Sequence, residues 1–156
     1  MMDSPDFYLY VFIGIGVILL VLLIPYVFFL INLQKTLASI SPENRKVEPG
    51  SVWLMFIPLF NLVWQFILVD RISDSIAAEC NRLNIPLEER RPTYNIGLAY
   101  CILSIAGGFI PVVGFLAAIV CFIIYWVKTA AYRNLIIANK ENFMLDAERD
   151  VFHTIQ

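Results

Sequence analysis

The chain has 156 residues, of which 60% are hydrophobic and 15% are charged. Soluble domains typically carry about 25% charged residues, so the deficit indicates a chain whose main solvent is lipid. The net charge of −2 argues against a nucleic-acid partner, and three cysteines with a single histidine argue against a metal or haem centre. We therefore expect no cofactor, no metal ion and no nucleic acid.

The first apolar run, residues 7–33, is long enough to predict a membrane-spanning helix. The residues before it lack the basic region of a signal peptide, so we interpret the run as a retained span. Pro25 lies inside it and predicts a kink, because proline removes one backbone donor. The polar loop 34–50 follows, with turn signals at Ser41-Pro42 and Pro49-Gly50.

The second apolar run, residues 51–69, predicts another span, and its helical pattern continues into charged sequence. Ile72, Ile76 and Leu83 recur at helical spacing among charged side chains, which predicts an amphipathic extension over residues 70–84. We expect one long helix through both parts. Pro58 lies inside this helix and predicts a kink, a helix that starts late, or a break that separates a short outer half from a long inner half. Full crossing of this run and re-entry at Pro58 are both open.

Residues 94–109 and 112–127 predict a third and a fourth span, joined by an uncharged turn at Pro111. The third span has a small-residue face that includes Gly97 and Gly107, which favours close helix packing in lipid. The tail, residues 139–156, repeats an amphipathic helical pattern through Phe143, Val151 and Ile155. Docking of this tail on the 70–84 extension and docking on a partner protein are both open.

Four spans place the N-terminus, residues 70–93 and the tail on one side of the membrane. That side carries eight Lys and Arg residues, and the opposite side carries three. By the positive-inside rule both termini are cytoplasmic. Phe56-Ile57-Pro58 also resembles Phe109-Ile110-Pro111, and each motif precedes an apolar helix that ends in charge. Internal duplication and chance similarity are both compatible with this repeat.

Asn61 and Gln65 are the most informative polar pair, because they lie one helical turn apart near the middle of the second span. Polar side chains at that depth face protein or water rather than lipid. They are interpreted either as interhelical hydrogen-bonding groups or as contacts for a transported substrate or ion.

The stretch from Asn32 to Ile76 resembles an uncharacterised family of small bacterial multi-pass membrane proteins, known as a domain of unknown function. The resemblance is carried by NLQKTL after the first span, then Pro49-Gly50, Trp53, Phe56, Pro58, Asn61-Leu62 and Arg71. The chain departs from the family pattern in having one tryptophan before the proline and Val63-Trp64 after it. The resemblance implies a bacterial inner-membrane protein and a multi-pass fold, and it implies no activity.

The sequence therefore predicts an all-α membrane protein of four transmembrane helices with cytoplasmic helical extensions. Its predicted function is that of a non-enzymatic accessory, scaffold or self-assembling subunit, without catalytic residues, whose partners are the bilayer and other membrane proteins or itself. The alternative is a small transporter or channel that uses Asn61, Gln65 and the Pro58 break. The predicted interaction surface comprises Ile72, Ile76, Leu83, Phe143, Val151 and Ile155.

Overall fold

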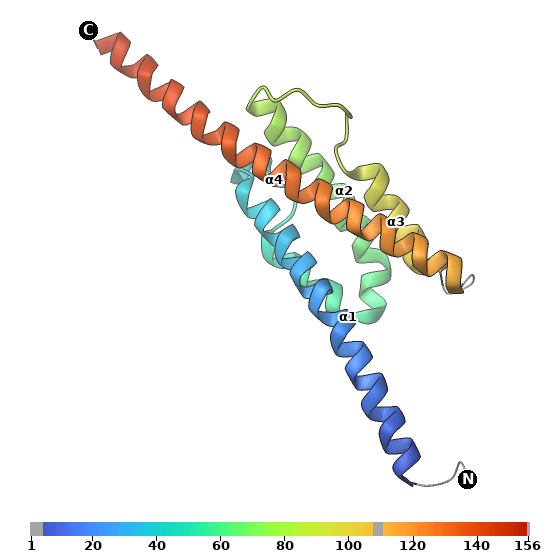
Figure 1. Cartoon of the computed structure of the whole chain (residues 1–156). Coiled ribbons are helices and arrows are strands. Elements are labelled where there is room, and N and C mark those ends of the chain that lie inside the picture. The colour runs from blue at the N-terminus through green and yellow to red at the C-terminus, as the bar shows by residue number, and fades with distance from the viewer. Residues whose placement is uncertain (1–4, 108–110, 156) are drawn as a thin grey trace. The chain divides into compact units, whose positions relative to one another are not determined.

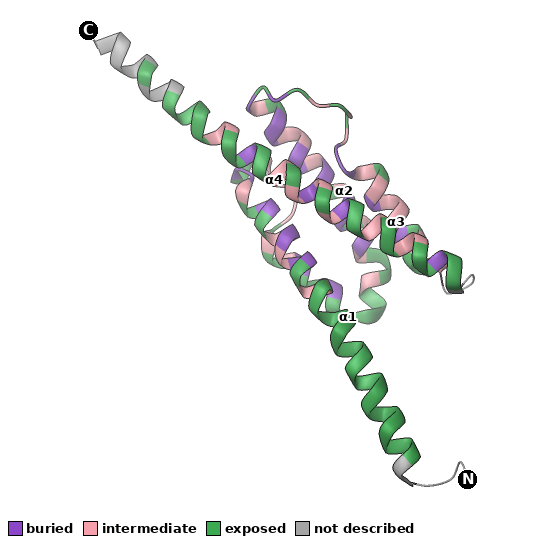
Figure 2. Ribbon diagram, in the orientation of Figure 1, coloured by how far each residue is buried: buried purple, intermediate pink, exposed green. Residues whose placement is uncertain are grey.

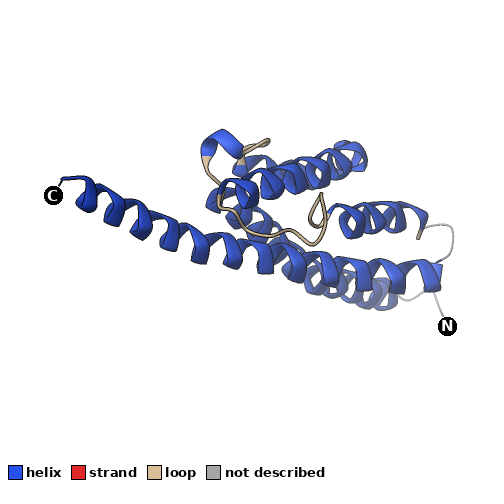
Figure 3. Cartoon of the chain, turned by 90° about the horizontal axis from the view of Figure 1, so that it is seen from above, coloured by secondary structure: helices blue, strands red, loops and turns tan. Residues whose placement is uncertain are grey.

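The computed structural model describes the backbone of residues 5–107 and 111–155, and the side chains of residues 7–107, 112–145 and 149. All regular structure in these residues is helical, as the composition predicts (Figure 3). The chain divides into two compact units, residues 1–31 and 32–156, which are described separately.

The first unit consists of most of helix α1, which runs from Pro5 to Ser39 without a break at Pro25. Every residue from 7 to 25 is exposed, including all the large apolar ones (Figure 2). No residue of its most apolar window is buried. The helix is therefore long and apolar enough to cross a membrane, and its side chains face outward all round.

The second unit contains the end of α1 and the rest of the chain (Figure 1). After α1 come two 3₁₀ segments, η1 (Pro42–Asn44) and η2 (Pro49–Phe56), and then α2 (Pro58–Arg82). Helices α3 (Tyr94–Ala106) and α4 (Pro111–Ile155) complete it. The core lies where α2, α3, α4 and the 40–56 segment meet, around Leu68, Ile72, Ile76 and Tyr125.

The predicted single helix over residues 51–84 is wrong at its start. Residues 49–56 form η2, and α2 begins only at Pro58. Proline has a fixed φ and no N–H, so it is well suited to the first position of a helix. The chain reverses direction at Pro58. This is shown by the Trp64 indole Nε1, which donates a 3.0 Å hydrogen bond to the Ser51 carbonyl across the turn. Segments η2 and α2 thus form a hairpin.

Helices α3 and α4 form a second antiparallel hairpin. The Tyr100 and Phe122 rings lie 5.5 Å apart between centroids. Gly107 and Gly114 touch near the turn, since a Cβ on Gly114 would lie 2.7 Å from the Gly107 Cα. Only glycine permits this approach, which explains part of the small-residue pattern in the third apolar run.

Gly97 brings α3 against both of its neighbours. A Cβ on Gly97 would lie 2.7 Å from Val69 Cγ1 on α2 and 2.9 Å from Tyr125 Cε2 on α4. The small face of α3 is therefore occupied within the chain itself.

The prediction of a helix of its own over residues 139–156 is also wrong, because α4 is one continuous helix of 45 residues that runs from Pro111 to Ile155. No glycine or proline occurs between Phe115 and Ile155, and alanine, leucine and lysine support the helix across residues 128–138. The apolar and amphipathic parts of this segment are thus one rod.

Two helices, α1 and α4, are long and apolar enough to cross a membrane. Helix α3 has 13 residues, about 20 Å at 1.5 Å per residue, against a hydrocarbon core of about 30 Å. The four-span prediction is therefore not supported. It also puts loop 34–50 and extension 70–84 on opposite sides of the bilayer, whereas the Lys46 backbone N–H donates to Ser75 Oγ at 2.9 Å.

Candidate functional site

The polar pair at positions 61 and 65 does not act as one site in the structure. Gln65 is buried, and its Oε1 lies 3.3 Å from Ser104 Oγ on α3. Asn61 is partly exposed, and its Oδ1 atom is buried without a hydrogen-bond partner among the residues that the structure describes. Gln65 thus links two helices, while Asn61 is left with an unused acceptor.

The two prolines predicted to break helices both lie at helix starts. Pro58 is the first residue of α2 and Pro111 is the first residue of α4. Neither interrupts a helix from within. The two prolines of the Phe-Ile-Pro repeat therefore hold equivalent positions, each at the start of a helix, while Phe109 and Ile110 lie outside the described residues.

The predicted interaction surface is divided by the structure. Ile72 and Ile76 are fully buried and Leu83 is buried, so these three belong to the core and cannot meet a partner. Phe143 is exposed on one side, with the Arg82 guanidinium 5.6 Å from its ring centroid. Val151 lies within α4, but its side chain falls outside the described residues. The same holds for Ile155.

A buried carboxylate, Glu79, forms the densest polar cluster of the second unit. Arg82 Nη2 donates to Glu79 Oε1 at 2.7 Å, and Ser41 Oγ donates to the same oxygen at 2.9 Å. Asn44 Nδ2 donates to Oε2 at 2.7 Å. Lys140 Nζ on α4 lies 3.3 Å from Ser41 Oγ. The cluster therefore joins the loop after α1, the end of α2 and α4.

The electrostatics of Glu79 show that this cluster holds a charge. Burial alone raises the pKa of this carboxyl, but hydrogen bonds from Arg82, Asn44 and Ser41 outweigh it and lower the pKa to about 2. The carboxylate is thus ionised and has donors on both oxygens. Such an arrangement is typical of a structural ion pair rather than an acid–base catalyst, whose pKa would lie near the operating pH.

Three further ion pairs join the linker between α2 and α3 to the helices. Arg91 Nη2 lies 2.6 Å from Asp70 Oδ1 and 2.8 Å from Asp74 Oδ1, and its guanidinium sits 4.2 Å from the Tyr94 ring centroid. Lys128 Nζ contacts Glu89 Oε1 at 2.6 Å.

Two hydrogen bonds at Asn32 join the end of α1 to α4. Asn32 Nδ2 donates to Thr129 Oγ1 at 3.0 Å, and Arg133 Nη1 donates to Asn32 Oδ1 at 2.9 Å. Asn32 and Thr129 are both buried.

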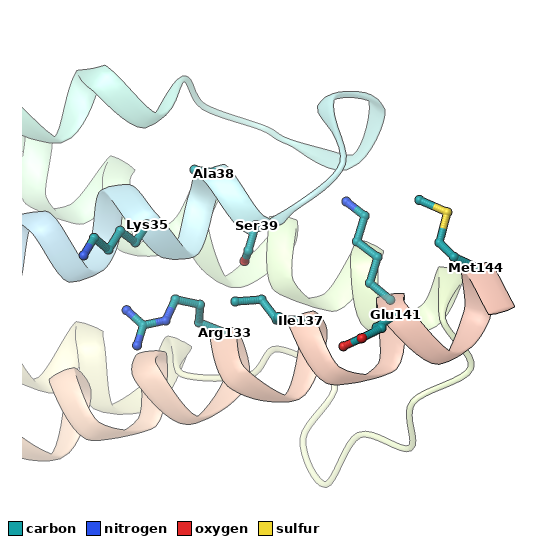
Figure 4. Close-up of a pocket in the computed structure, with 8 residues that line it drawn as sticks. Lys35, Ala38, Ser39, Arg133, Ile137, Glu141 and Met144 are labelled. Atoms are coloured by element: carbon teal, nitrogen blue, oxygen red, sulfur yellow. The ribbon is translucent and has the colours of Figure 1, made fainter.

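An open groove of about 600 Å³ runs between the end of α1 and α4 beside this contact (Figure 4). It is lined by Lys35, Ala38, Ser39, Arg133, Ile137, Lys140, Glu141 and Met144. Lys35 and Arg133 extend side by side along it (Figure 4). Because Arg133 and Lys140 already bond to Asn32 and Ser41, we interpret the groove as a seam between two helices.

The sequence reasoning missed the Glu79 cluster, although a signal was present. Positions 72, 76, 79 and 83 are spaced by four, three and four residues, which places Glu79 on the same helix face as Ile72, Ile76 and Leu83. A carboxylate within an apolar stripe requires partners. Asp70 and Asp74, one turn apart, likewise called for a cation such as Arg91.

Comparison of this chain with family models, curated proteins and solved structures finds no match. The family resemblance of residues 32–76, and the bacterial origin that it implies, stay predictions.

Proposed function

We propose that the protein is an integral protein of the bacterial cytoplasmic membrane that serves as a non-enzymatic accessory, scaffold or self-assembling subunit. The observation that carries membrane residence is the exposure of its most apolar helices. None of the most apolar window of α1 is buried, and only 17% of that of α4. The core helix of a soluble protein would be largely covered, and soluble proteins rarely expose apolar patches beyond a few hundred Å².

A subunit role is supported by the part of α4 that follows Lys128. Phe143, Met144 and Leu145 are all exposed there, in a segment flanked by charged residues. Charged flanks place this segment in water, where three adjacent apolar side chains favour contact with another protein. The small-residue face of α3 gives no such support, because α2 and α4 already cover it.

The test is the mass of the native assembly after mild detergent extraction from its own membrane. We expect a discrete complex that contains other proteins or several copies of the chain. Met144→Asp should dissociate it. The matched control Asn142→Asp adds the same charge two residues away at an exposed position and should leave it intact. A monomer in the unmodified protein would contradict the subunit role.

One observation favours the second candidate, a small transporter or channel. The Oδ1 of Asn61 is a buried acceptor without a hydrogen-bond partner among the described residues, and a polar solute that reached it would supply one. An Asn61→Leu protein that folds and assembles normally but loses solute flux would support transport.

A further inference from the structure

Two long uncharged stretches follow α1, and each forms one hairpin. Residues 49–69 and 92–127 contain no Asp, Glu, Lys or Arg. The first stretch turns at Pro58 and the second at Pro111. Apolar exposure is greatest beside these turns: Leu59 is 84% exposed and Val112 is 72% exposed. Each hairpin therefore has an apolar tip, open to its surroundings.

The three charged stretches that flank these hairpins contact one another. Asn44 bonds Glu79 at 2.7 Å, which joins the 35–48 loop to the end of α2. Glu89 bonds Lys128 at 2.6 Å, which joins the α2–α3 linker to α4. Three stretches held together by direct polar contacts cannot lie on opposite sides of a hydrocarbon layer about 30 Å thick.

One arm of each hairpin is too short to cross such a layer, although α4 by itself is long and apolar enough. From Pro58 to Asp70 helix α2 rises about 18 Å, and α3 rises about 18 Å from Tyr94 to Ala106. From Pro111 to Lys128 helix α4 rises about 26 Å. The hydrocarbon core measures about 30 Å, so the α2 and α3 arms end a little past the middle of the bilayer, and the apolar part of α4 also stops short of the far side.

The backbone of the first turn is suited to a site without water. The Ile57 N–H donates to the Leu54 carbonyl at 3.1 Å, and the Asn61 N–H donates to the Ile57 carbonyl at 2.7 Å. Pro58 has no N–H to satisfy. A turn placed in lipid must meet its backbone hydrogen-bonding needs internally, and proline at the tip reduces that need. Pro111 brings the same advantage to the second turn.

We propose that both hairpins are re-entrant: they enter the hydrocarbon layer from one face of the membrane and return to that face, with their tips in contact with lipid acyl chains. Among the described helices only α1 then crosses. All eleven Lys and Arg residues follow the apolar run 7–33 of α1, so they share one side, which the positive-inside rule makes cytoplasmic. The N-terminus lies on the opposite side. This topology differs from the one with both termini in the cytoplasm, and it rests on the membrane residence proposed above.

The test uses single cysteines and a membrane-impermeant maleimide on cells that express the full chain. Asp3→Cys reports the N-terminus. The three charged stretches are reported by Glu48→Cys, Glu88→Cys and Ala138→Cys, and all three of these positions are exposed in the structure. We expect labelling of Asp3→Cys alone in intact cells, and of all four after permeabilisation. Labelling of Glu48→Cys or of Glu88→Cys from outside would overturn the proposal, because full crossing of residues 51–69 leaves one of these two positions on the outer side.

Leu59→Cys and Val112→Cys test the tips directly. Both should resist the reagent in intact and in permeabilised cells and react fully once the protein is denatured in detergent. Reaction of Val112→Cys in intact cells would show instead that the second hairpin crosses. The unmodified chain gives the background, which should be low, since burial and the neighbouring Glu79 charge raise the pKa of Cys80 to about 11.

Alkaline carbonate extraction separates the two proposals. A chain that stays in the membrane but labels at Glu48→Cys from outside retains membrane residence and loses the re-entrant topology. A chain released by carbonate loses both.

Discussion

Asn44 and Glu79 are joined by a 2.7 Å hydrogen bond across 35 residues of sequence, and the chain between them is the apolar hairpin of η2 and α2. The hairpin leaves the polar region and returns to it, and this bond closes its base. This hydrogen bond therefore holds the two ends of the hairpin together at its base.

Replacement of Glu79 tests how much this closure contributes to stability. Glu79→Gln keeps the size of the side chain but removes the charge that Arg82 neutralises, and we expect a loss of about 3 kcal/mol, typical of a buried pair that loses one partner. The measurement is the thermal midpoint of the detergent-solubilised protein. Glu48→Gln, at an exposed position, should change it little; equal midpoints for the two variants would contradict a structural role for Glu79.

The same carboxylate predicts a pH dependence. Its pKa is lowered in the folded state to about 2, so its stabilising effect is complete above the unfolded value of about 4.3 and is lost as the pH falls through the folded value. The effect corresponds to about 3 kcal/mol. Thermal midpoints of the unmodified protein and of Glu79→Gln should therefore converge between pH 5 and pH 2, because the unmodified protein loses ~3 kcal/mol of stability over that range. A gap independent of pH would refute the linkage.

Gly97→Ala tests the close packing of α3. The added Cβ would overlap Val69, whose β-branched side chain is stiff, and the Tyr125 ring, so we expect a loss of about 1–3 kcal/mol. Gly50→Ala is the control, because no atom lies within 4 Å of its Cβ position. Unfolding of both variants in detergent is the measurement, and a neutral Gly97→Ala would mean that α3 can shift without cost.

The polar pair of α2 should respond unequally to leucine. Gln65→Leu removes a hydrogen bond to Ser104 and should cost about 1 kcal/mol. Asn61→Leu removes a buried acceptor that has no partner, so it should be neutral or stabilising. Side-by-side unfolding curves check the contrast. The reverse order of stability would show that Asn61 finds a partner in the membrane.

The apolar periodicity and the charge breaks predicted where helices occur, and the all-helical fold follows from them. They failed where two uncharged stretches had to be assigned either to full spans or to hairpins. Length alone favoured a span over residues 51–69, and Pro58 was compatible with a kink, a late helix start and a break. The distinction depends on contacts such as Lys46 with Ser75, which join segments far apart in the sequence and leave no periodic signal.

The candidate residues show the same limit. Ile72 and Ile76 form a stripe that is equally suited to a partner or to the chain's own core, and only the folded chain, in which both are fully buried, decides between them. Glu79 was recognisable as unusual from its spacing. Its partners Ser41 and Asn44 were not, because loop residues have no periodic pattern from which the helix they pack against could be predicted.

The continuity of α4 has a mechanical consequence. The helix has no glycine or proline after Gly114, so it has no evident hinge between the hairpin turn and its C-terminal end. The part beyond Lys128 is about 40 Å long at 1.5 Å per residue. A tilt of about 5° at Lys128 would displace its far end by about 3.5 Å. In the proposed membrane arrangement, a small tilt of the apolar part of α4 would therefore produce a larger displacement at its C-terminal end.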